Sequence, residues 1–221
     1  MSVPKEPIVL GASHSIFNQY LAEMRDEVIQ ADRLRFRYNM QRASEIIAYE
    51  MSKALEFKNT SIITPLGSLE APILAERPVI GVILRAGLAM HEGFLRIFDS
   101  ADNAFISAFR QHNPSMENQF EIKVEYVSTS ELQGRTLMLL DPMIATGRTI
   151  VLSYQELTKA GLPDKVLIGG IIGSEEGIEY VQRRLPKAQI YIGAIDNELT
   201  AKGYIVPGLG DAGDLAFGSK N

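Results

Sequence analysis

The amino-acid sequence predicts an α/β fold with a central, mostly parallel sheet flanked by helices. Short apolar runs in the sequence are continuous rather than alternating, which is typical of strands covered on both faces. Segments with helical periodicity separate these runs, and strands that alternate with helices build parallel sheets. Since no internal repeat or clear linker divides the chain, residues 1–221 are expected to form a single domain.

The first part of the chain is predicted to be helical. Residues 15–57 carry apolar side chains at spacings that place them along one side of a helix. We interpret the arginines of this region mainly as a solvated face or a subunit contact. These arginines are Arg25, Arg33, Arg35, Arg37 and Arg42. Residues 60–75 come next and are predicted to form a small β-hairpin, or arm.

The apolar runs that follow are each predicted to be a buried strand. They cover residues 79–84, 103–109, 136–140, 166–172 and 190–195, and helices are expected at 88–98, 147–159 and 175–184. Residues 110–129 depart from this alternation of strands and helices. They are predicted to form a polar loop followed by a strand in which polar and apolar residues alternate. The polar stretch 111–119 is long enough to close over a ligand as a lid.

Composition limits the functional classes. The chain has 22 basic and 27 acidic residues, so its net charge of −5 provides no overall attraction to nucleic acid or an anionic membrane. The absence of cysteine excludes disulfides, thiolate metal sites and cysteine nucleophiles. His14, His91 and His112 lack metal-ligand spacing. Because there is no signal-like start and no run of about 18 apolar residues, we expect a cytoplasmic protein without membrane contact.

Polar groups stand directly at the ends of three predicted strands. In open α/β sheets, ligands bind beyond the carboxyl ends of the strands. Asp141 closes one apolar run, and residues 146–149 would begin a helix whose amides and dipole favour a phosphate. Arg85 and Arg110 end two other runs, where a guanidinium group suits a second anion. Each feature alone also fits a structural turn, but together they indicate a ligand site.

One motif matches a nucleotide-binding pattern but lacks the surrounding elements that such a fold requires. Residues 208–213, "GLGDAG", match the dinucleotide pattern G-x-G-x-x-G. Only eight residues follow it, which leaves no room for the helix, second strand and ribose-binding acid of a dinucleotide fold. The pattern of a P-loop is also absent from the sequence. Neither nucleotide-binding fold is therefore expected.

The stretch "TLMLLDPMIATGRT" at 136–149 resembles the phosphoribosyl-pyrophosphate (PRPP) motif of type I phosphoribosyltransferases, and its Asp-Pro-Met form is similar to that of the uracil phosphoribosyltransferases. Further matches are "MRDE" at 24–27, "AYE" at 48–50, "ILRAGLAM" at 83–90 and "DNELTAKGYIVPGLGDAGD" at 196–214. The resemblance implies the type I phosphoribosyltransferase fold, with N-terminal helices, a β-arm and a C-terminal base-binding hood at 196–218. It implies transfer of a phosphoribosyl group from PRPP to uracil, giving UMP and pyrophosphate.

The resemblance also implies residue roles. Asp141 would hold the ribose hydroxyls, the loop after it the 5-phosphate, and Arg85 and Arg110 the pyrophosphate. Asp211 would face PRPP through Mg²⁺, the implied cofactor, or through water, as a general base or only to orient metal and water; no direct metal ligand is expected. The implied PRPP-binding residues are Arg85, Arg110, Asp141, Pro142, Met143, Ile144, Ala145, Thr146, Gly147, Arg148, Thr149 and Asp211. The implied catalytic residues are Arg85, Arg110 and Asp211, and Ile205, Gly210, Asp211 and Ala212 would bind uracil, largely through the backbone.

Two positions depart from the family pattern. Arg148 stands where the motif usually has glycine, so it either adds a cation to the phosphate loop or points to solvent. Leu215 stands where a basic residue usually follows the C-terminal motif, which weakens any role for a cation there.

Three other functions fit the same fold. A phosphoribosyltransferase for another base is one, although the C-terminal loop argues for uracil. The others are an RNA-binding regulator of pyrimidine genes, whose basic face is not obvious at this net charge, and a nucleotide sensor. The resemblance further implies a homodimer or higher homo-oligomer, with the N-terminal helices and the arm as contacts, and leaves GTP or CTP as candidate effectors.

Overall fold

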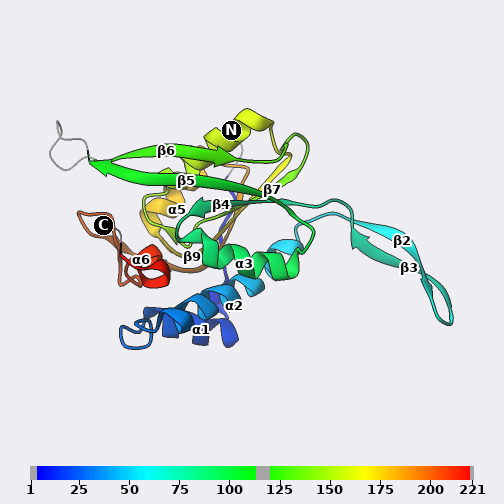
Figure 1. Cartoon of the computed structure of the whole chain (residues 1–221), viewed down its shortest axis with the longest axis horizontal. Coiled ribbons are helices and arrows are strands. Elements are labelled where there is room, and N and C mark those ends of the chain that lie inside the picture. Colours follow the sequence, from blue (N-terminus) through cyan, green and yellow to red (C-terminus); the bar gives the residue numbers. More distant parts are fainter. Residues whose placement is uncertain (1–3, 113–119, 220–221) are drawn as a thin grey trace.

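The computed structural model describes residues 4–112 and 120–219, and its centre is a sheet with helices on both faces (Figure 1). The strand order is β1-β10-β9-β7-β4-β5-β6, and β8 pairs with β9 beside this path. Only the β5–β6 pair is antiparallel among these neighbours. The predicted α/β class with a mostly parallel sheet is confirmed.

The elements have the following bounds. The strands are β1 (Ile8–Val9), β2 (Phe57–Thr64), β3 (Gly67–Leu74), β4 (Val79–Leu84), β5 (Asp102–His112), β6 (Phe120–Ser128), β7 (Thr136–Leu140), β8 (Met143–Ile144), β9 (Lys165–Ser174), β10 (Gln189–Asp196), β11 (Glu198–Leu199) and β12 (Ile205–Val206). The helices are α1 (Ile16–Arg25), α2 (Arg33–Ser52), α3 (Gly87–Ile97), α4 (Arg148–Leu157), α5 (Glu175–Arg184) and α6 (Ala212–Phe217), with short 3-10 turns at Leu10–Ala12 and Thr158–Ala160.

The inner strands separate two hydrophobic cores. In β7, Met138 and Leu140 pack into a core shared with α2 and α3, whereas Leu137 and Leu139 pack into a core shared with α4 and α5. All four side chains are fully buried. Because successive strand residues point to opposite faces, a strand covered on both sides needs apolar residues at every position. This arrangement accounts for the continuous apolar runs of the sequence.

The prediction of one helical region over residues 15–57 is wrong in two places. The chain turns between α1 and α2, where the Asp26 carboxylate accepts hydrogen bonds from the amides of Val28 and Ile29. The Asp32 carboxylate then caps α2 by accepting from the amides of Leu34 and Arg35. Aspartate competes with helical hydrogen bonding in this way and favours turns and helix starts. At its other end, α2 stops at Ser52, and Phe57 already belongs to strand β2.

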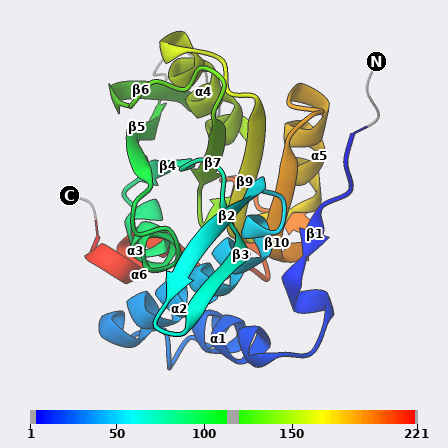
Figure 2. The same ribbon diagram turned by 90° about the vertical axis from the view of Figure 1, so that its right-hand side faces the viewer.

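The predicted arm is confirmed as the antiparallel hairpin of β2 and β3, which begins three residues earlier than expected. Figure 1 shows it extending away from the sheet and its helices, and in Figure 2 it lies in front of them. Apolar side chains at its tip lie in solvent, with Ile63 at 88% and Leu66 at 100% exposure.

The alternating strand predicted before residue 129 is confirmed as β6, which pairs with β5. Residues 111 and 112, assigned to the polar loop, continue strand β5 instead. The remainder of the predicted lid, residues 113–119, lies outside the described residues.

Four arginines of the N-terminal helices make specific contacts within the chain. Arg25 and Arg35 form ion pairs, and Arg37 donates a hydrogen bond from Nη1 to the carbonyl of Ala216 at 2.8 Å. The guanidinium of Arg42 lies 5.6 and 5.9 Å from the ring centres of two tyrosines. Arg33 and Arg35 are exposed, as a solvated face requires, whereas Arg25, Arg37 and Arg42 are only partly exposed and serve contacts within the chain.

Glu23 joins α1 to α2. Its carboxylate is 7% exposed and accepts hydrogen bonds from Arg35 Nε at 2.7 Å, Gln19 Nε2 at 2.9 Å and Asn39 Nδ2 at 2.7 Å. Chiefly the hydrogen bond from Arg35, and then those from Gln19 and Asn39, lower the pKa of Glu23 from 4.5 to about 2, against the opposing effect of burial.

We expect Glu23→Gln to lower the free energy of unfolding by about 1.5–3 kcal/mol at neutral pH, the range for hydrogen bonds to a charged group. Because the pKa is lower in the folded state, this stabilisation is complete above about pH 4.5 and is lost as the pH falls toward 2. Urea unfolding of both proteins across that range is the measurement. The two stabilities should converge in acid, and a difference independent of pH would contradict the assignment.

Candidate active site

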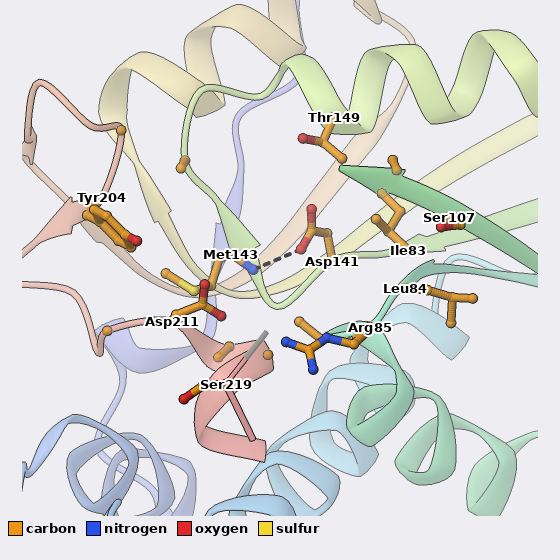
Figure 3. A pocket seen from close by; sticks show the side chains of 17 residues that line it. Ile83, Leu84, Arg85, Ser107, Asp141, Met143, Thr149, Tyr204, Asp211 and Ser219 are labelled. Carbon is orange, nitrogen blue, oxygen red and sulfur yellow. Dashed lines mark hydrogen bonds between the residues drawn. The ribbon is translucent and has the colours of Figure 1, made fainter. Parts of the chain in front are cut away.

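A cavity of about 820 Å³ opens at the carboxyl ends of β4 and β7, beside the middle of β5. On the opposite side it is bounded by residues 196–218, which we call the hood and which contain the β11–β12 hairpin and α6. Figure 3 shows side chains from the strand ends and from the hood around one space. Of the predicted site residues, the cavity lining includes Arg85, Asp141, Met143, Ala145, Thr149, Gly210, Asp211 and Ala212.

The loop after β7 is held by backbone contacts with β9. The amide of Asp141 donates to the carbonyl of Gly169 at 3.1 Å, and the carbonyl of Pro142 accepts from the amides of Ile171 and Ile172 at 3.0 Å each. The carboxylate of Asp141 accepts from the amide of Met143 at 3.2 Å, drawn as a dashed line in Figure 3. These contacts fix the position of Asp141 at the cavity wall.

The end of the same loop rests on the start of α5. Gly147 is the N-cap of α4 with φ of +70°, and a Cβ atom there would lie 2.5 Å from the carbonyl oxygen of Gly177. The hydroxyl of Ser174 donates to the carbonyl of Ala145 at 2.5 Å and accepts from the amide of Gly177 at 2.9 Å. The left-handed conformation and the close approach both require glycine at 147. The helix therefore begins one residue later than predicted, without a side-chain cap.

Several predicted residues do not line the cavity. Pro142, Ile144 and Gly147 are buried, and Ile205 is only 4% exposed and packs in the core. Thr146 is also absent from the lining, and Arg148 is exposed at the start of α4. These positions shape the loops rather than presenting side chains to the cavity. The side chain of Arg110 lies outside the described part of the structure.

Arg85 follows β4 and reaches across the cavity toward the hood (Figure 3). Its Nη2 atom lies 2.8 Å from Asp214 Oδ1, and its Nη1 atom donates to the carbonyl of Gly218 at 3.0 Å. Its Nε is buried without a hydrogen-bond partner among the described residues. The peptide bond between Leu84 and Arg85 is cis. This arginine therefore joins the wall formed by β4 to the C-terminal segment.

The hood holds its own loop through local hydrogen bonds. Asp211 is the N-cap of α6, since its Oδ1 accepts from the amide of Asp214 at 3.0 Å. Gly208 and Gly210 both have positive φ, at +62° and +92°. The segment "GLGDAG" thus forms this loop and the first turn of α6.

Several residues of this region were not predicted from the sequence, and four of them have polar groups or mark an irregular point of the sheet. Ser107 and Ala108 of β5 line the cavity where the pairing register of β5 and β6 shifts, and Tyr204 lines it from the hood. Asp214 was missed as the partner of Arg85. A serine inside an apolar run and a second acid in "GDAGD" were the available signals.

The described residues contain neither a membrane span nor a preformed metal cluster. Among the helices described, none has the length and apolar character needed to cross a bilayer. Within residues 4–112 and 120–219, no group of three or more histidine, cysteine, aspartate or glutamate side chains is placed to hold a metal ion.

Comparison with known proteins identifies the family. The family model described as "Uracil phosphoribosyltransferase" matches residues 11–219. A curated uracil phosphoribosyltransferase from Porphyromonas gingivalis is 44% identical, with 97% of this chain and 99% of that protein covered. One from Pyrococcus furiosus is 36% identical, covering 90% and 85% respectively.

A solved structure agrees over nearly the whole chain. A protein from Aquifex aeolicus superposes with a TM-score of 0.85 at 29% identity, over 96% of this chain and 98% of that one. The family match includes the β7 loop, Arg85 and the hood that together bound the cavity. The chain therefore belongs to the uracil phosphoribosyltransferase family.

Proposed function

We propose that this protein transfers the phosphoribosyl group of PRPP to uracil, giving UMP and pyrophosphate. One observation carries the proposal. A single cavity is bounded by Asp141 and Thr149 of the β7 loop, by Arg85 after β4, and by the backbone of Gly210–Ala212 in the hood. The β7 loop can bind a sugar phosphate, Arg85 can bind an anionic leaving group, and the hood can bind a flat base. The relatives' names support the same activity.

PRPP is proposed to bind along the strand ends. Its 5-phosphate lies at the start of α4, where free amides and the helix dipole favour an anion, with the hydroxyl of Thr149 nearby in the cavity wall. Its ribose hydroxyls donate to Asp141. Its pyrophosphate binds Arg85, which exchanges its contacts with Asp214 and Gly218 for phosphate oxygens. The family resemblance adds Arg110 to the pyrophosphate site.

Uracil is proposed to be recognised by main-chain groups of the hood, where Gly210, Asp211 and Ala212 lie at the cavity wall. The base has two carbonyl acceptors and an N3–H donor, which main-chain amides and a carbonyl can match. Cytosine presents an amino group in place of one carbonyl, so a buried amide donor would lose its acceptor, and such mismatches discriminate strongly. Ile205 contributes through its backbone, because its side chain is buried.

The reaction is a displacement at the anomeric carbon of PRPP by N1 of uracil: the bond from N1 to that carbon forms, the bond to pyrophosphate breaks, and the N1 proton passes to water or to the departing pyrophosphate. By analogy with glycoside chemistry, it passes through an oxocarbenium-like state. The chain contributes by holding the base beside that carbon and by stabilising the departing pyrophosphate with Arg85. Asp211 already accepts the amide of Asp214 through Oδ1. We therefore favour for it a role in orienting water or metal over that of a general base.

Mg²⁺ fits the residues that are present. Asp141 and Asp211 offer hard carboxylate oxygens at the cavity wall, and the described residues form no dedicated metal cage. Mg²⁺ usually keeps several waters and binds substrate phosphates with one or two carboxylates. Asp211 would hold it, directly or through water. When bound, the ion supplies positive charge for the leaving pyrophosphate.

Three further properties are part of the proposal. The protein acts in the cytoplasm. It forms a homodimer or higher homo-oligomer through the β2–β3 arm, whose exposed Ile63 and Leu66 are suited to a subunit contact. GTP and CTP are the candidate effectors. An RNA-binding regulator or a nucleotide sensor is not favoured, because the family model and the relatives bear the name of the transferase.

The test is a panel of bases. Purified protein is mixed with Mg²⁺, PRPP and one of uracil, cytosine, hypoxanthine or orotate, and nucleotide and pyrophosphate are measured. We expect UMP from uracil and no nucleotide from the other bases, because only uracil matches the hood's donors and acceptor. Omitting PRPP is the control. If no base forms a nucleotide, the transferase proposal fails, and product from another base alone would reassign the substrate.

A further inference from the structure

An ion pair joins the end of α1 to the start of the hood, between Arg25 and Asp196, the last residue of β10. Arg25 Nη1 is 2.7 Å from Asp196 Oδ2, and Nη2 is 2.8 Å from Oδ1. The side chains are 22% and 8% exposed. A bidentate guanidinium–carboxylate pair fixes both distance and orientation. Neither residue lines the 820 Å³ cavity, and Arg25 instead lines a second cavity of about 560 Å³ on the other side of the hood loop.

Both members of this pair also hold Gly208. Arg25 Nη1 donates to the carbonyl of Gly208 at 2.9 Å, and the amide of Gly208 donates to Asp196 Oδ2 at 2.9 Å. The donor and the acceptor of this one residue are thus fixed by the two charged partners. A Cβ atom at 208 would collide with the carbonyl oxygen of Ile205, so the loop is tightly folded at this point. Gly208 lies two residues before Gly210 at the cavity wall.

The same contacts favour the ionised form of the Asp196 carboxyl group. Burial raises the pKa of Asp196, but the hydrogen bonds from Arg25 and from the amide of Gly208 outweigh it, so the pKa lies below its usual value. Asp196 is therefore a carboxylate at neutral pH and can accept from both groups at once.

We propose that Arg25 and Asp196 are positioning residues for base recognition, which hold Gly208 so that the Gly210–Ala212 backbone faces the cavity. The inference rests on the proposed function, in which the base is read by backbone groups. Such groups cannot adjust by rotating a side chain, so their direction is set by the loop. A shift of about 1 Å in a positioned group can cost up to about 100-fold. Loss of the pair should therefore weaken base binding specifically.

The rival explanation is that the pair only stabilises the fold. A matched control distinguishes the two, because Glu23 lies two residues before Arg25 on the same helix and also forms an ion pair through a buried carboxylate. The hydrogen-bond partners of Glu23 are Gln19 on its own helix and Arg35 and Asn39 on α2, so its contacts join the two N-terminal helices rather than the hood. Glu23→Gln should lower stability without changing base recognition.

The experiment compares wild type, Arg25→Ala, Asp196→Asn and Glu23→Gln by steady-state kinetics and thermal unfolding. We expect Arg25→Ala to raise KM for uracil about 10- to 100-fold, while KM for PRPP changes less than about twofold. Asp196→Asn should give a smaller rise, because the amide oxygen still accepts one hydrogen bond. Glu23→Gln should lower Tm and leave both KM values unchanged. A uracil KM unaltered in Arg25→Ala, or raised equally in Glu23→Gln, would overturn the inference.

Hydrogen exchange gives a readout that needs no activity. Peptides covering residues 205–218 should exchange faster in Arg25→Ala than in wild type, with peptides of β4 and β7 unchanged, whereas Glu23→Gln should leave the hood protected. If Arg25→Ala does not fold, Asp196→Asn takes its place in both measurements. A wild type that forms no UMP refutes the proposed function alone, and unchanged exchange in the hood refutes this inference alone.

Discussion

Replacing Asp141 with asparagine is expected to lower kcat/KM for PRPP by about 100- to 1000-fold, while Tm changes little. The carboxylate is proposed to accept hydrogen bonds from two ribose hydroxyls, and hydrogen bonds to a charged group contribute about 1.5–3 kcal/mol each. An amide is neutral and presents one oxygen instead of two. It can still accept the hydrogen bond from the amide of Met143, so the loop should keep its conformation.

Steady-state kinetics with varied PRPP, together with thermal unfolding, measure this effect. Asp164→Asn is the matched control, because Asp164 is an exposed aspartate directly before β9, at the opposite end of the sheet from the cavity. It should behave as wild type. Equal kcat/KM values for Asp141→Asn and wild type would remove Asp141 from the proposed PRPP site.

Replacing Arg85 with alanine is expected to lower kcat by about 100- to 1000-fold, comparable to the loss of a donor that stabilises transition-state charge in other enzymes. The leaving pyrophosphate gains negative charge as the bond to the anomeric carbon breaks, and Arg85 is the cation that the structure places in the cavity wall after β4. Arg85→Lys should recover only part of the rate, since an ammonium group cannot make the bidentate contact.

Arg85→Ala also removes the contacts to Asp214 and Gly218, so a second variant must separate the two effects. Asp214→Asn breaks the ion pair but leaves the guanidinium in place, and we expect its kcat to fall far less. Arg77→Ala is the control for removing an exposed arginine at the other end of β4. Measurements of single turnover and of pyrophosphate release identify the affected step. If Asp214→Asn reproduced the full loss, Arg85 would act through the hood rather than on pyrophosphate.

Much of the fold could be predicted because its signals are local. The runs at 79–84 and 136–140 coincide with β4 and β7, since a strand buried on both faces needs apolar residues throughout. The placement of Asp141 and Arg85 at one sheet edge also followed from chain order alone, because parallel strands direct their carboxyl ends to the same side. The break between α1 and α2 was missed although Asp26 and Asp32 signalled it.

The candidate site was predicted less completely, because several of its contacts join distant parts of the chain. Arg25 and Asp196 are 171 positions apart, and Arg85 and Asp214 are 129 apart. No periodicity or spacing in the sequence indicates which carboxylate each arginine meets. The burial of Ile205 and the solvent exposure of Arg148 depend in the same way on how the hood and α4 pack.

The sequence by itself therefore determined the strands, the chemistry at their ends and the family, since each of these depends on residue type and order over short segments. Only the tertiary structure decided that the hood closes on the sheet edge, that Arg85 bridges the two, and that the ion pair of Arg25 and Asp196 holds Gly208. The physical reason is that burial and charge pairing depend on the path of the whole chain, whereas strand and helix signals depend on neighbouring residues.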